Sequence, residues 1–66
     1  MSVAKTSEIT ASSSKSFEDA VRKGIGKMSK TVDNIEGAWV KEQKVVVKDG
    51  EVTAYRVTMK ITFIVN

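Results

Sequence analysis

The chain has 66 residues without cysteine, histidine or proline, and its 11 Lys and Arg against 8 Asp and Glu give a formal charge of +3. This composition excludes a disulfide framework, a metal site built from thiolate or imidazole, and catalysis by a Cys-His or Ser-His-Asp group. Any bound metal would need oxygen ligands, which limits the choice to hard cations such as Ca²⁺ or Mg²⁺.

The short length predicts association. A domain near 60 residues buries only about 60% of its unfolded surface and is marginally stable alone. Small chains without disulfides usually gain the missing stability from a metal or from oligomerisation. We therefore expect a single domain over residues 1–66 that forms a homo-oligomer.

Several partners and locations are disfavoured by the sequence. No apolar run reaches the ~18–20 residues of a membrane span, and residues 1–5 lack the apolar segment of a signal peptide. We expect a cytoplasmic protein with no membrane partner. The lysines are spread along the chain and no nucleic-acid-binding motif accompanies them, so we expect no nucleic-acid partner either.

A first strand is predicted over residues 3–11, and a helix follows it. Ser16 is a good N-cap, with Asp19 three residues later and Glu18 beside it at the positive end of the helix dipole. Apolar residues then recur at the spacing of one helical face, namely Phe17, Val21, Ile25, Met28, Val32 and Ile35. Gly24 and Gly26 interrupt this helix, either as tolerated packing or surface glycines or to admit the backbone of another subunit.

The remaining chain predicts a long β-hairpin with arms over residues 39–47 and 51–65. Asp49 and Gly50 between the arms are typical of a type I′ turn. The second arm alternates, and its apolar row comprises Tyr55, Val57, Met59, Ile61, Phe63 and Val65. We expect this row to pack on the helix, and we expect Ala38 and Val40 of the first arm to share its inner face.

The turn also predicts the register of the hairpin. It places Lys48 opposite Glu51, and on the outward face it pairs Gln43 with Arg56, Lys41 with Thr58 and Trp39 with Lys60. The predicted fold class is therefore α+β with the order β-α-β-β, a three-stranded antiparallel sheet packed on one helix.

The outward face of this sheet should carry Trp39, Val45, Val47 and Ile64. An exposed tryptophan in a chain with four aromatic residues indicates a partner, because tryptophan is enriched at interfaces and stacking sites. Three interpretations stay open: a subunit interface filled by Trp39, a planar ligand stacked on it, and exposure without a function.

Short sequence segments resemble the dodecin family along nearly the whole chain. They are Lys5, Glu8 and Ser13, then 16–20, Ser29–Val32 with Ile35, 40–43, Asp49-Gly50 and 55–63. The resemblance implies a hollow homododecamer of β-α-β-β subunits that binds riboflavin or its phosphates in stacked pairs. It also implies flavin storage or buffering without turnover, so we expect no enzyme activity.

Two positions of the expected flavin site depart from the family pattern. Gly37 stands where flavin-binding dodecins usually have the stacking Trp, and Trp39 lies two residues later on the same face. Arg56 stands where the family has a Gln that bonds the flavin ring, and Arg only donates hydrogen bonds. Lys44 matches a position that is often basic, near the phosphate end of the ligand.

We therefore take Trp39 as the stacking residue and Arg56 as the polar partner of a flavin, with Gln43 and Lys44 completing the candidate site. The alternative is a flavin-free dodecin-like structural assembly. In that assembly Trp39 and Arg56 close the site, and the protein binds hard cations or other small anions instead.

Overall fold

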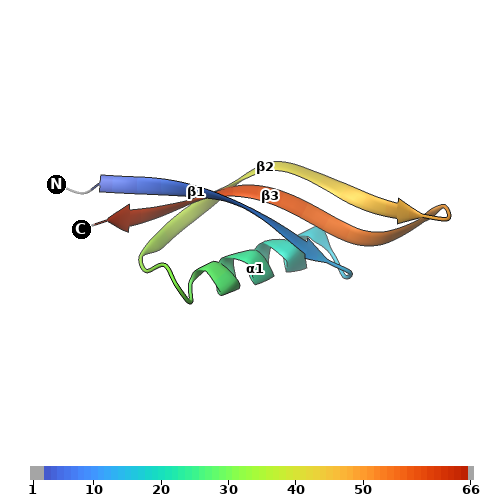
Figure 1. Ribbon diagram of the computed structural model, residues 1–66, viewed down its shortest axis with the longest axis horizontal. Helices are drawn as coiled ribbons and strands as arrows, with labels where there is room; N and C mark the ends of the chain where they lie inside the picture. The colour runs from blue at the N-terminus through green and yellow to red at the C-terminus, as the bar shows by residue number, and fades with distance from the viewer. Residues whose placement is uncertain (1–2, 66) are drawn as a thin grey trace.

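The computed structural model describes residues 3–65, so residues 1, 2 and 66 of the expected domain lie outside the described part. Its elements are β1 (Val3–Ser13), α1 (Phe17–Met28), β2 (Ile35–Lys48) and β3 (Glu51–Val65). The strands form one antiparallel sheet in the order β1-β3-β2, with α1 lying along one face (Figure 1). The predicted α+β fold and its β-α-β-β order are confirmed.

The helix begins as predicted but ends earlier. The Ser16 hydroxyl accepts a hydrogen bond of 3.0 Å from the Asp19 N–H, which caps the first turn. The apolar spacing predicted a helical face as far as Ile35, and this is wrong, because α1 ends at Met28. Asn34 adopts a φ of 61°, a left-handed conformation that asparagine tolerates, and it directs Ile35 into β2.

The core lies between α1 and the central strand β3. Its buried members, each 0% exposed, are Ala20, Val57, Met59 and Ile61. Gly24 brings the helix close to this core, because a Cβ there would lie 2.9 Å from Met59 Cε and 3.0 Å from Ala11 Cβ. Gly24 is thus a packing glycine within the chain, whereas a Cβ on Gly26 would meet nothing within 4 Å.

The β2–β3 turn has the predicted conformation. Asp49 has a φ of 51° and Gly50 a φ of 78°, and positive φ at both central residues defines a type I′ turn. Strand β3 has the predicted bounds, whereas β1 continues to Ser13 and β2 starts at Ile35, four residues earlier than predicted.

The register agrees with the prediction at the two ends of the hairpin but not in its middle. Lys48 pairs with Glu51 and Trp39 with Lys60, as predicted. Register shifts occur between Val46 and Val47 and between Val40 and Glu42, and each leaves one residue of the ladder unpaired.

Between these two bulges the pairing moves by one residue, which corrects the prediction for Gln43 and Lys41. Lys44, not Gln43, pairs with Arg56, and Glu42, not Lys41, pairs with Thr58. Gln43 instead pairs with Val57 of the core, because a one-residue slip exchanges the faces of a strand. Val45 pairs with Tyr55 and so lies on the helix side of the sheet. Val47, two residues later on the same strand, lies on that side too. The prediction that both face outward is therefore wrong.

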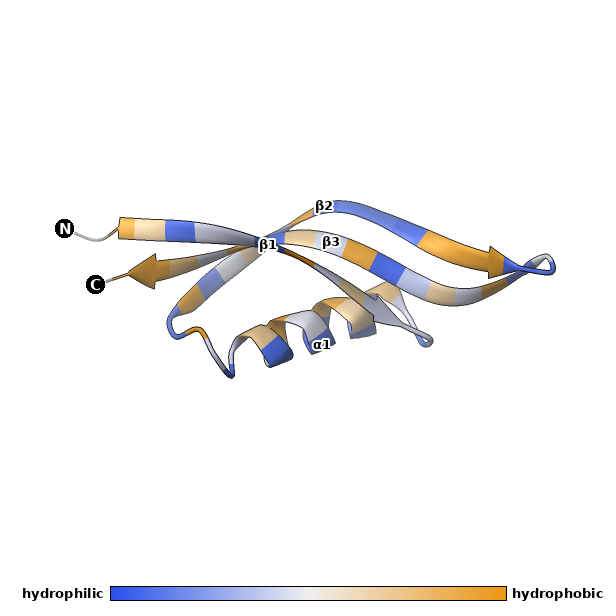
Figure 2. Cartoon of the chain, in the orientation of Figure 1, coloured by the Kyte–Doolittle hydropathy of each residue, from blue (hydrophilic) through white to orange (hydrophobic). Residues whose placement is uncertain are grey.

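The helix packs on β1 and β3 and leaves β2 largely bare. Ala38 and Val40 pair with Ile61 and Met59 of the core, so both lie on the inner face as predicted. Both are nevertheless exposed, Val40 by 40%, because α1 does not extend over β2. Figure 2 shows an apolar stretch in the half of β2 next to the turn, beyond the N-terminal end of α1. Within residues 3–65, no helix is long and apolar enough to cross a membrane.

Candidate functional site

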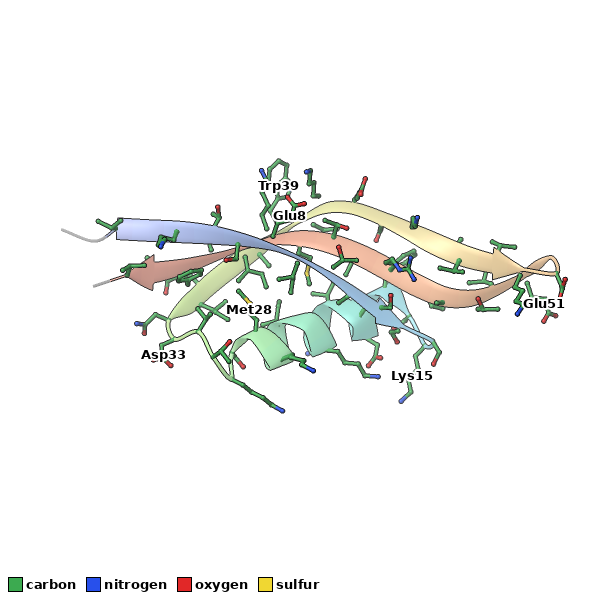
Figure 3. The ribbon with its side chains drawn as sticks, in the orientation of Figure 1. Glu8, Lys15, Met28, Asp33, Trp39 and Glu51 are labelled. Atoms are coloured by element: carbon green, nitrogen blue, oxygen red, sulfur yellow. The ribbon has the colours of Figure 1, made fainter. Side chains whose placement is uncertain are left out.

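The face of the sheet turned away from α1, called here the outer face, is largely polar. Ile64 lies on it as predicted, and Trp39 is its most exposed large apolar side chain. Cross-strand pairing and side-chain contacts place on it Glu8, Thr10 and Ser12 of β1, Trp39, Lys41, Glu42 and Lys44 of β2, and Arg56, Thr58 and Lys60 of β3. Figure 3 shows Trp39 and Glu8 projecting from the sheet on the side opposite Met28. The exposed hydroxyls and charges make this face a candidate binding surface.

Trp39 is the most exposed large apolar side chain of the described residues, at 66%. Its indole ring contacts the ammonium group of Lys60, whose nitrogen lies 5.6 Å from the ring centroid. Beside this pair, Lys41 Nζ lies 3.3 Å from Glu8 Oε1 across β3, and the two form an ion pair. The ring is therefore positioned by neighbours on its own sheet and remains open to a planar partner.

Arg56 lies farther along the outer face, towards the β2–β3 turn. Its Nε donates a hydrogen bond of 3.0 Å to Ser12 Oγ on β1, and Lys44 lies opposite it on β2. Beside Arg56, the Thr10 and Thr58 hydroxyls lie 3.1 Å apart.

These residues surround a shallow cavity of about 220 Å³, called here the Arg56 cavity. It is lined by Thr10, Glu42, Gln43, Lys44, Arg56 and Thr58. Three of the four predicted site residues therefore border one cavity, although Gln43 pairs with buried Val57.

Trp39 does not line the Arg56 cavity. Its register partner Lys60 lies four residues beyond Arg56 on β3, which corresponds to roughly 13 Å along the strand. Within one protomer, the predicted stacking residue and the predicted polar partner therefore belong to different parts of the outer face.

Sequence reasoning missed the contribution of β1. Thr10 lines the Arg56 cavity and Ser12 holds the guanidinium of Arg56. The alternation of polar residues at Thr6, Glu8, Thr10 and Ser12 was the available signal, since period-two polarity marks the exposed face of a strand. The pairing of Ser12 with Arg56 depends on the β1–β3 register, which no local turn specifies.

Gly37, which the sequence resemblance places at the expected stacking position, pairs with Thr62 on the outer face. A Cβ added to Gly37 would meet nothing within 4 Å, so a larger side chain has room there. For metals, residues 3–65 bring together no group of three or more acidic side chains.

The arrangement of one helix on a three-stranded antiparallel sheet, with a bare polar outer face, defines a class of small β-α-β-β subunits. Residues 3–66 match the family model described as Dodecin, and the chain belongs to the dodecin family. At the level of sequence alone, no curated protein is significantly similar to the chain.

Solved structures agree with this assignment. Dodecin from Streptomyces davaonensis is 28% identical with a TM-score of 0.93, and the alignment covers 98% of this chain and 96% of that one. A second relative is a calcium-chelating dodecin from Mycobacterium tuberculosis, described as having a calcium-binding site. It is 31% identical with a TM-score of 0.82, and the alignment covers 92% of this chain and 87% of that one. A variant of Thermus thermophilus dodecin, at 23% identity and a TM-score of 0.94, shares the fold over 100% of this chain and 98% of its own.

Proposed function

We propose that this chain is a single domain that forms a hollow homododecamer in the cytoplasm and binds riboflavin or FMN for storage or sequestration, without catalysis. Flavin binding and dodecameric assembly are typical of the dodecin family, to which the chain belongs. The observation that carries the proposal is Trp39, which is 66% exposed on the outer face of a dodecin fold. A flat aromatic ligand is the partner that such a side chain fits best.

The apolar surface of β2 supports the assembly. Val40 is 40% exposed, Val45 38% and Val47 58%, and their register places them on the helix side of the sheet, beside the helix rather than beneath it. Continuous exposed apolar side chains mark interaction surfaces. Burial of this surface between copies would supply the stability that so short a chain lacks alone.

The candidate residues have distinct roles in this proposal. Trp39 stacks on the isoalloxazine ring, and Arg56 donates hydrogen bonds to its carbonyl oxygens. Gln43 borders the same cavity, but it pairs with Val57 of the core and so has no role on the outer face. Lys44, opposite Arg56, attracts the phosphate of FMN. Because Trp39 and Arg56 are separated along the sheet of one protomer, the complete site combines residues of two neighbouring subunits.

A second candidate is the flavin-free assembly, and the departures at Gly37 and Arg56 favour it. Gly37 removes the stacking ring from the usual position, and Arg56 borders the cavity with a long, permanently charged side chain. In this form the protein binds a hard cation or a small anion. Calcium is the relevant cation to test, because the M. tuberculosis relative is described as calcium-binding.

Fluorescence titration separates the two candidates. Riboflavin and FMN are titrated with the assembled protein, and flavin binding predicts strong quenching that saturates near equimolar flavin and subunit. The Trp39→Ala variant should lose this quenching, while Lys48→Ala, at the turn end of β2, should keep it. Unchanged flavin emission at micromolar protein would exclude flavin binding, and a parallel calcium titration then tests the second candidate.

The assembly has a separate readout. Light scattering after gel filtration should give the mass of twelve chains, as expected for a dodecin. A monomer or dimer at micromolar concentration would contradict the proposed shell, whatever the flavin titration shows.

A further inference from the structure

Two cationic side chains face each other directly across the β2–β3 ladder, because Lys44 is the register partner of Arg56. Like charges directly opposite in an antiparallel pair destabilise a sheet. The ion pairs found among residues 3–65 involve Arg22, Lys23 and Lys41, and neither Lys44 nor Arg56 takes part in one. This part of the outer face therefore holds positive charge that no carboxylate of the described chain neutralises by contact.

The guanidinium of Arg56 is held in place by the neighbouring strand. Its Nε donates to Ser12 Oγ at 3.0 Å, and Ser12 is the register partner of Arg56 on β1. Within the described part of the chain, this is the one hydrogen bond that the side chain of Arg56 makes, so its terminal N–H groups remain available. A fork of donors fixed at one end is well suited to bind the oxygens of a phosphate group.

The cavity beside Arg56 supplies further donors. Of its lining residues, Thr10 and Thr58 share a hydrogen bond of 3.1 Å between their hydroxyls, which leaves one of the two O–H groups as a donor, and Lys44 contributes an ammonium group. Guanidinium, ammonium and hydroxyl donors that converge on a cavity of about 220 Å³ match a small tetrahedral oxyanion in charge and in hydrogen bonding.

We propose that the Arg56 cavity is an oxyanion site that binds a phosphate group through Arg56, Lys44 and the free O–H of the Thr10–Thr58 pair. The site deepens the flavin-free candidate, on which it rests, because it names the small anion and the residues that bind it. It requires neither an isoalloxazine ring nor Trp39, which lies outside the cavity. Inorganic phosphate and the phosphate of a larger molecule share this chemistry.

Glu42 is the one acidic residue that lines the cavity, and its carboxylate repels an anionic ligand. It pairs with Thr58, and within residues 3–65 its carboxylate makes no ion pair with Arg56 or Lys44. Two cations against one carboxylate leave the cavity positive. An anion must still overcome repulsion by Glu42, so removal of this charge should strengthen binding.

Isothermal titration of inorganic phosphate into the assembled protein tests the site, in a phosphate-free buffer of constant ionic strength near pH 7.5. Binding should saturate, and Arg56→Gln should weaken it by about tenfold or more, since a charge-assisted hydrogen bond is lost. Lys44→Gln should weaken it by roughly threefold to tenfold, and Glu42→Gln should tighten it.

Lys30→Gln is the matched control, because Lys30 follows α1 and does not line the Arg56 cavity. It removes the same charge and should leave phosphate affinity unchanged. Absence of saturable phosphate binding, or equal weakening by Lys30→Gln and Arg56→Gln, would overturn the proposal. Gel filtration confirms that each variant keeps the native assembly.

The flavin titration distinguishes failure of this site from failure of the flavin proposal. Phosphate binding that depends on Arg56, without any flavin quenching, supports the oxyanion site and excludes flavin. Flavin quenching that is equal for FMN and riboflavin and unaffected by Arg56→Gln, in a protein that does not bind phosphate, supports flavin and overturns the oxyanion site. A preference for FMN over riboflavin that Arg56→Gln abolishes identifies the bound phosphate as part of the flavin.

Discussion

The ammonium nitrogen of Lys60 lies 5.6 Å from the ring centroid of Trp39, its register partner across the β2–β3 ladder. Trp39 is 66% exposed, so this contact is the main constraint on its ring among the described residues. A cation held over one face of the indole leaves the opposite face for a stacked ligand. The pair thus connects the strand register to the proposed flavin contact.

Lys60→Met should remove the cation–π contact that holds the ring of Trp39 in place. Because a cation–π contact at an exposed site contributes roughly 0.5–1 kcal/mol, we expect a loss of that size in the free energy of unfolding. The intrinsic emission of Trp39, the single tryptophan, should shift as well. Urea unfolding at constant protein concentration measures the first effect and an emission spectrum the second.

Lys48→Met, at the turn end of β2, is the control for this experiment. It removes the same charge away from Trp39 and should change neither quantity. If Lys60→Met also leaves both quantities unchanged, the contact between Lys60 and Trp39 does not persist in solution.

Gly24→Ala should destabilise the protein although alanine favours helices. The added Cβ would lie 3.0 Å from Ala11 Cβ, which is attached to the backbone of β1 and cannot easily move, and 2.9 Å from the flexible end of Met59. Overpacking of a core typically costs about 1–3 kcal/mol, which exceeds the gain of up to about 1 kcal/mol in helix propensity. We expect a net loss of about 1 kcal/mol in the free energy of unfolding.

Gly26→Ala, one half-turn away in the same helix, is the matched control. Its Cβ would meet nothing within 4 Å, so the propensity gain should appear as a stabilisation of up to about 1 kcal/mol. Chemical unfolding of both variants at equal concentration provides the comparison. Stabilisation by both substitutions would show that the helix does not approach β1 as closely as described.

Asp19 makes the stability of the helix start dependent on pH. A hydrogen bond from the Ser13 hydroxyl, followed by the Lys23 ammonium at 3.2 Å, lowers the pKa of Asp19 below its ordinary value of 3.8. Since the folded-state pKa is the lower one, this stabilisation is present above about pH 4 and is lost as the pH falls through the folded-state pKa.

Asp19→Asn should therefore lower stability at neutral pH, and its difference from the unmodified chain should shrink as the pH falls below about 4. Glu18→Gln is the control, because that carboxylate is 79% exposed and lies 3.9 Å from Arg22 in an exposed pair. Urea unfolding between pH 2.5 and 7, a range chosen to bracket the ordinary pKa of a carboxyl, measures both variants. A difference for Asp19→Asn that stays constant over this range would contradict the role of the carboxylate.

The parts of the fold that the sequence predicted well depend on local chemistry. The Ser16 cap, the turn at Asp49 and Gly50 and the bounds of β3 follow from residues that are adjacent in the chain. The end of α1 was mispredicted because Val32 and Ile35 continue the helical spacing by coincidence, although the helix ends at Met28 and Asn34 turns the chain into β2.

The candidate site was harder to predict, because it depends on pairings between distant residues. Trp39 and Arg56 could be selected from the sequence as unusual side chains on the outward face. The two register shifts that place Lys44 rather than Gln43 opposite Arg56 have no local sequence signal. The same limit applies to Ser12, which contacts Arg56 only because β1 pairs with β3.

Gly37→Trp should strengthen flavin binding by restoring the usual aromatic residue of the family. The position accepts the change, because a Cβ there would meet nothing within 4 Å and the residue pairs with Thr62 on the outer face. A base stacked on an aromatic side chain typically gains about 1–3 kcal/mol, and a similar gain for the isoalloxazine ring would raise affinity by roughly tenfold or more.

Flavin fluorescence titration measures this gain, and Lys48→Trp is the control that adds an exposed tryptophan at the turn end of the same strand. Combining Gly37→Trp with Arg56→Gln should raise riboflavin affinity further, because a Gln side chain both donates to and accepts from the ring edge, whereas Arg only donates. If neither the single nor the double variant exceeds the Lys48→Trp control, the outer face around Gly37 does not bind flavin. Gly37 and Arg56 would then mark a dodecin fold whose ligand is not a flavin.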